Sequence, residues 1–258
     1  MARTRAAADA TPLFLLYAGL HALLVLVQCR IVGVSSAGSL IVVLIAVALV
    51  WDNGLIGCGR RICNKDASSS SREFRRLAML SQPRFIAHAV LTPFLAVSAL
   101  ELGERAGVSW VTTTSVWRVC SGLSLIGLVH HLLHPRLTLR HAHPKEPKGS
   151  WMRPVVSMTI ASLADDAAAT TAAQKGITLA LMIGPAVLVC VFTLAIGASI
   201  VQLPTATPAS LAAGRWLWIC SLIELLSNAG PPWTMAITGN AGEVVLLAGF
   251  VAADWLLY

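Results

Sequence analysis

The most constraining feature of this sequence is a series of long stretches without charged residues. These stretches are 10–29, 31–51, 85–100, 106–117, 119–135 and 176–214. Two further stretches, 209–228 and 241–258, are apolar apart from two charged residues each. An α-helix needs about 20 apolar residues to cross the hydrocarbon core of a bilayer. The sequence therefore predicts a chain that crosses a membrane several times.

The composition excludes a water-soluble domain. Charged residues make up 12% of the chain and hydrophobic residues 56%, whereas soluble domains have roughly 25% charged residues. So few charges cannot cover the surface of a soluble globule. The apolar stretches also lack the polar and apolar alternation of membrane β-strands, as Ile41–Trp51 shows, and a helix satisfies its backbone within the segment.

The predicted fold is all-α, a polytopic transmembrane helical bundle with about seven spans in one integral membrane domain over residues 1–258. The expected spans are about 11–29, 33–51, 85–103, 110–133, 177–201, 209–228 and 240–258. The first span also resembles a signal peptide, because a basic start precedes it and small residues follow it. Its apolar run is long for a signal peptide, so we expect a retained anchor; removal would leave six spans.

The basic residues indicate how the chain sits in the membrane. Seven spans place the N-terminus and the loops 58–84 and 135–175 on one side, and these segments hold 15 of the 19 Lys and Arg residues. The positive-inside rule assigns that side to the cytosol or an equivalent compartment. The net charge of +7 also favours contact of the basic loops with anionic lipid. No interleaving of basic and aromatic residues suggests a nucleic-acid partner.

Ionisable and amide groups at membrane depth are costly, and several are expected near the cytosolic ends of the spans. The candidate ligand-pocket residues are Asp52, Asn53, Arg84, His88, His130, Glu224, Asn240 and Glu243. Residues three or four apart share a helix face, and Pro93 should kink its helix and free a carbonyl group. If the helices form one bundle, these groups meet in a polar pocket.

Structural roles compete with this interpretation. Asp52 and Asn53 could end a helix, Arg84 could be an interfacial anchor, and His130 could face water. Glu224 and Glu243 could form ion pairs or hydrogen bonds between helices.

Another set of charged residues is expected near the outer ends of the spans. Arg118 needs an acidic partner there, and the candidates by depth are Glu101 and Asp254. We interpret Arg118, Glu101 and Asp254 as candidates for a structural ion pair.

The sequence leaves the chemistry open. It contains no CxxC, HExxH or phosphate-binding glycine motif, so no metal site is predicted, and whether the protein is an enzyme stays undecided. The first hypothesis is a protein that transports or transfers a small molecule or lipid at the pocket. The second is a protein with a single haem or pigment held through His88 and His130, although no cofactor is the simpler expectation. The third is a non-catalytic accessory subunit or assembly factor of a membrane complex.

Overall fold

The structure is a computed structural model of the whole chain. It describes residues 8–9, 11–62, 72–73, 76, 79–80, 83, 87–110, 112–133, 152–153, 172–229 and 232–258. Its elements are β1 (Ala8–Asp9), α1 (Thr11–Val27), η1 (Gln28–Val32), α2 (Ala37–Ile62), η2 (Ala87–Leu91), η3 (Thr92–Phe94), α4 (Leu95–Arg105), α5 (Thr113–Leu133), β2 (Met152–Arg153), α7 (Ala172–Gln202), α8 (Pro208–Ser227) and α9 (Pro232–Leu257). The two short strands pair in parallel.

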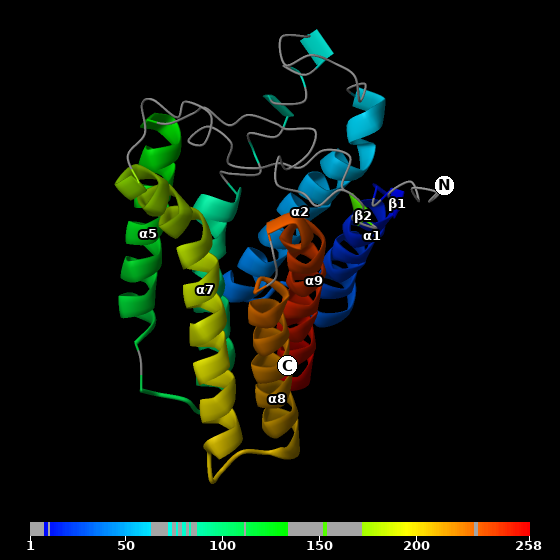
Figure 1. Cartoon of the computed structure of the whole chain (residues 1–258). Helices are drawn as coiled ribbons and strands as arrows, with labels where there is room; N and C mark the ends of the chain where they lie inside the picture. The colour runs from blue at the N-terminus through cyan, green and yellow to red at the C-terminus, as the bar shows by residue number, and fades with distance from the viewer. Residues whose placement is uncertain are drawn as a thin grey trace, which may run out of the picture.

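The helices form one bundle in which successive helices alternate in direction (Figure 1). We call the end at which α1 begins the N face, and the end at which α9 finishes the C face. Helices α2, α5 and α8 finish at the N face, whereas η1, α4 and α7 finish toward the C face (Figure 1). The predicted fold class is confirmed: the chain is an all-helical membrane bundle of about six to seven helices.

Helix length and surface chemistry both fit a bilayer. Within the described residues, five segments are long and apolar enough to cross a membrane: Pro12–Val32, Ala37–Cys58, Gly184–Gln202, Pro208–Ser227 and Ile237–Leu257. Helix α5 contributes a shorter apolar segment, Thr113–Val129. Large apolar side chains such as Leu26, Val119 and Trp255 are exposed, which suits contact with lipid tails.

Helix α2 continues through Asp52 and Asn53 to Ile62, so these two residues do not end it. Leu55 and Ile56 in this last part are buried, and Ile56 packs with Phe14 of α1. Apolar contact with α1 therefore stabilises a helix that extends beyond the charge-free stretch.

The third span is interrupted at Pro93, as its sequence predicts. A π-helical turn, η2, passes into a 3-10 turn, η3, before α4 begins. Proline lacks an N–H group, so carbonyl groups near it lose their helical partners. Helix α5 supplies side-chain donors at this interruption: Ser124 Oγ donates to the Val90 carbonyl over 2.7 Å, and Cys120 Sγ donates to the Pro93 carbonyl over 3.0 Å. In lipid these bonds make an irregular backbone tolerable.

Small residues bring α7, α8 and α9 into close contact. A Cβ atom on Gly197 of α7 would lie 2.7 Å from the Gly214 carbonyl oxygen of α8. A Cβ atom on Gly249 of α9 would lie 2.7 Å from the Cβ atom of Cys220 on α8. Membrane helices associate without a hydrophobic driving force, so close packing of this kind contributes strongly to their association.

Candidate functional site

A partly open cavity of about 50 Å³ lies between several helices of the bundle. A single water molecule needs only about 10–15 Å³ by a comparable measure, so the cavity has room for a few waters or a small ligand. The residues that line it are Ile45, Ala48, Leu49, Thr92, Leu95, Ala186, Val189, Cys190, Glu224, Glu243, Leu246 and Leu247. Two carboxylates thus line an otherwise largely apolar cavity within membrane-spanning helices.

Glu224 is held in place by its own helix and by a glycine opposite. Its side chain is 5% exposed. Asn228 Nδ2 donates to Glu224 Oε1 over 2.8 Å, and Ser227 Oγ, whose shorter hydrogen bond of 2.7 Å goes to the Glu224 carbonyl, lies 3.3 Å from Oε2. The carboxylate also lies against Gly242 of α9, where a Cβ atom would overlap it. The Asn228 amide at the end of α8 and the missing side chain on α9 together fix the position of this carboxylate.

The two carboxylates of the cavity interact electrostatically. Glu224 and Glu243 repel each other, and both act on Cys190 across the cavity. Two like charges in an apolar site are costly unless a proton or a cation neutralises one of them.

The cavity lies beside two prolines. Thr92, which lines it, precedes Pro93 in the interrupted third span, and Ala186, which also lines it, follows Pro185 inside the continuous helix α7. Each proline removes one backbone donor. An interrupted helix beside the binding site is a frequent feature of membrane transporters.

Three other candidates from the sequence lie one helical turn from the cavity, toward the N face. Asp52 and Asn53 follow Ala48 and Leu49 by four residues on α2, and Asn240 precedes Glu243 by three residues on α9. All three are at most 4% exposed. Asn53 Nδ2 donates to the Leu49 carbonyl over 3.0 Å. The structure therefore places buried polar groups between the cavity and the N face.

His21 on α1 extends this polar region. It is completely buried, its Nδ1 donates to the Tyr17 carbonyl over 2.9 Å, and Asp52 lies close enough to act on it electrostatically. The sequence suggests only a hydrogen-bonded core histidine here, because a lone histidine in an apolar span carries no signal of its partner on another helix.

The haem hypothesis is not tested by the structure. The backbone of His88 lies in η2 and that of His130 in α5, and these two elements pack together at Ala89 and Gly127. The side chains of both histidines, and Arg84 as a whole, lie outside the described residues.

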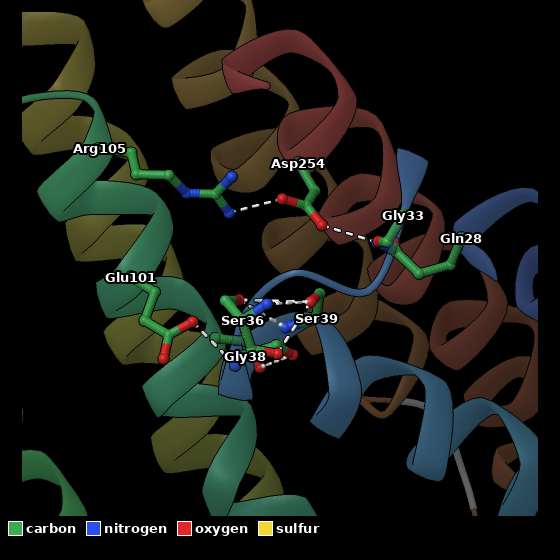
Figure 2. Close-up of polar contacts among 9 residues, drawn as sticks. Gln28, Gly33, Ser36, Gly38, Ser39, Glu101, Arg105 and Asp254 are labelled. Carbon is green, nitrogen blue, oxygen red and sulfur yellow. Dashed lines mark hydrogen bonds and ion pairs between the residues drawn. The ribbon is translucent and has the colours of Figure 1, made fainter. Parts of the chain in front are cut away.

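A second polar cluster lies near the C face (Figure 2). Asp254 of α9 forms an ion pair with Arg105 of α4 over 2.5 Å, and Gln28 Nε2 of η1 donates to the other Asp254 oxygen over 2.7 Å. The Gln28 amide also donates to the Gly33 carbonyl over 2.8 Å. The Asp254 side chain is 7% exposed and that of Arg105 is 31% exposed. These contacts connect three segments that are far apart in the sequence.

The same cluster joins α4 to the start of α2. The Gly38 amide donates to Glu101 Oε2 over 2.8 Å (Figure 2). Ser98 Oγ donates to the Gly38 carbonyl over 2.9 Å. The sequence suggests Arg118 as the basic partner, whereas Asp254 pairs with Arg105 in the structure and Arg118 is exposed on α5. Arg105 is one helical turn beyond Glu101, which brings its guanidinium to the same cluster.

Comparison with known proteins adds no relative. No family model, no curated protein and no solved structure matches the chain. The function must therefore be argued from the site. Within the described residues, no group of three or more His, Cys, Asp or Glu could hold a metal ion, and the five described cysteines are free.

Proposed function

We propose that the protein is a membrane transporter of small cations, and that Glu224 and Glu243 bind the cation. The observation that carries the proposal is the pair of carboxylates in one apolar cavity within membrane-spanning helices. Ionisable residues at such depth are expensive and generally mark ion or substrate pathways. A bound cation would offset the repulsion between the two carboxylates.

The dimensions of the cavity support a small substrate. A volume of about 50 Å³ admits a proton carried by water, an alkali-metal ion or a small ammonium compound. The interrupted span beside Thr92 supplies backbone groups that a cation could approach.

The entry side follows from the polar layer and the charge pattern. Asp52, Asn53 and Asn240 lie between the cavity and the N face, so the cavity is hydrated more readily from that side. The basic residues of loops 58–84 and 135–175 assign the N face to the cytosol under the positive-inside rule. We therefore assign the cytosolic side as the entrance to the cation site.

Carbodiimide labelling tests whether these carboxylates bind a cation. Dicyclohexylcarbodiimide reacts with protonated carboxyl groups in apolar surroundings, and mass spectrometry locates the product. We expect labelling of Glu224 or Glu243, slowed by methylammonium ions. We also expect proteoliposomes to accumulate labelled methylammonium, and the Glu224→Gln variant to reduce uptake to the level of protein-free liposomes.

Glu104→Gln is the matched control. Glu104 is an exposed carboxylate near the C face that accepts a hydrogen bond from Thr113, and it lies outside the cavity. Uptake should be unchanged in this variant. Labelling of the cavity that methylammonium does not slow, together with no uptake by the intact protein, would refute the proposal and favour the accessory-subunit hypothesis. A visible absorption band in the purified protein would favour the haem or pigment hypothesis instead.

A further inference from the structure

We propose that the polar cluster formed by Gln28, Gly38, Glu101, Arg105 and Asp254, here called the C-face cluster, is the gate that closes the cation cavity toward the C face. The inference rests on the proposed function, because only a transported substrate needs access to both faces. It identifies the part of the molecule that controls access to the cavity from the C face.

The position of the C-face cluster fits a gate. On α2, Ile45 lines the cavity and Gly38 lies seven residues nearer the C face. On α9, Leu247 lines the cavity and Asp254 lies seven residues nearer the C face. Seven residues of helix span about 10 Å. The cluster is thus displaced from the cavity by about two helical turns on both helices.

Apolar side chains separate the cavity from the cluster. Phe250 lies between Leu247 and Asp254 on α9 and is 1% exposed, and Val42 lies between Ile45 and Gly38 on α2 and is 4% exposed. Both of these side chains also line a second void of about 10 Å³, which Glu101, Arg105 and Asp254 border on the other side. The two voids therefore lie in sequence along the same helices, with one apolar layer between them.

The contacts of the cluster suit a barrier that can open. They join η1, α2, α4 and α9 through a few directional bonds: Arg105 and Gln28 to Asp254, and Gly38 to Glu101 (Figure 2). Breaking the ion pair would leave the Asp254 carboxylate with a single amide donor. The Asp254 carboxylate is buried while the Arg105 side chain is partly exposed, so the pair can separate by movement of the arginine toward the C face.

Glycines with positive φ angles adjoin the cluster on both sides. Of the residues that the structure describes, only Gly33 and Gly107 have positive φ angles, 94° and 100°. Gly33 follows η1 and accepts the Gln28 amide at its carbonyl, and Gly107 lies two residues beyond Arg105. Glycine tolerates large changes of backbone angle, so these turns can absorb a movement of α4 against η1 and α9.

Cys190 allows the gate to be tested without knowing the substrate, because it lines the cavity and is 2% exposed. The other five cysteines are replaced by alanine, and a membrane-impermeant cationic methanethiosulfonate is added to each side of vesicles separately. We expect Arg105→Gln to raise the rate of Cys190 modification from the C face by about tenfold or more, as a population shift toward an open state requires. Arg118→Gln, which removes an exposed arginine of α5, should leave the rate unchanged.

A second variant covers the case in which Arg105→Gln does not fold. Glu101→Gln weakens the contact with Gly38 and should raise the rate in the same direction. Unchanged rates in folded Arg105→Gln and Glu101→Gln proteins would overturn the gate. This result is independent of cation binding, so methylammonium protection of Glu224 can succeed while the gate fails, and the reverse.

Discussion

The contact between α7 and α8 at Gly197 allows a quantitative prediction for the Gly197→Ala variant. A Cβ atom at Gly197 would lie 2.7 Å from the Gly214 carbonyl oxygen and 2.8 Å from the Trp218 backbone nitrogen. Both atoms belong to the backbone and cannot rotate away, so the two helices must separate by several tenths of an ångström. Overpacking of this kind typically costs about 1–3 kcal/mol.

A matched glycine removes the intrinsic helix preference from the comparison. Alanine stabilises a helix by about 1 kcal/mol relative to glycine, and this gain applies to both positions. Gly122 on α5 is exposed, and a Cβ atom there would meet nothing within 4 Å. The free energy of unfolding should therefore be lower for Gly197→Ala than for Gly122→Ala by about 1–3 kcal/mol, which is the overpacking cost alone.

Equilibrium unfolding in mixed detergent micelles, followed by circular dichroism, measures both variants under the same conditions. The double variant Gly197→Ala with Gly214→Ala should be less stable than either single variant, because a Cβ atom at Gly214 would also lie 2.9 Å from the Gly197 carbonyl oxygen. Equal stability of the Gly197→Ala and Gly122→Ala proteins would refute the close backbone contact on which this argument depends.

Two further predictions concern the cavity and the interrupted span. A Cβ atom at Gly242 would overlap the Glu224 carboxylate, so Gly242→Ala should slow carbodiimide labelling of Glu224. Gly184→Ala is the control and should leave the labelling rate unchanged, because a Cβ atom there meets nothing within 4 Å. Equal labelling rates in the two variants would contradict the contact between Gly242 and Glu224. Ser124 Oγ donates to the Val90 carbonyl in the interrupted span, so Ser124→Ala should lower the free energy of unfolding by about 0.5–1.5 kcal/mol. The same detergent titration measures this change. An unchanged free energy of unfolding would show that the hydrogen bond from Ser124 does not stabilise the interrupted span.

The sequence predicts the fold class because the length of each charge-free stretch can be counted along the chain and compared with the thickness of the hydrocarbon core. It also identifies Pro93 as an interruption, because the missing N–H group is intrinsic to proline. Glu224 and Glu243 are likewise visible from the sequence, since each interrupts an apolar run. Their meeting in one cavity depends on the rotation of α8 against α9.

The C-face cluster shows why the other contacts were not predictable. Arg105 and Arg118 both lie near expected outer ends of spans, and only the packing of α4 against α9 selects Arg105 as the partner of Asp254. Gln28 is uncharged and gives no signal in a search for charged groups, although it is 1% exposed and contacts Asp254. The extension of α2 to Ile62 depends on burial against α1, which a local pattern of residues does not reveal.

The close contacts of α7, α8 and α9 determine how the molecule can deform. At Gly197 the nearest atoms are backbone atoms of α8, and at Gly249 the nearest atom is the Cβ atom of Cys220. None of these atoms can rotate away to absorb sliding, so these three helices should shift together. Arg105 belongs to α4, whereas Asp254 belongs to α9, so their ion pair lies on the border between this trio and the remaining helices. A conformational change at the C face would accordingly be a single rotation of one part of the bundle against the other, and not a set of separate helix movements.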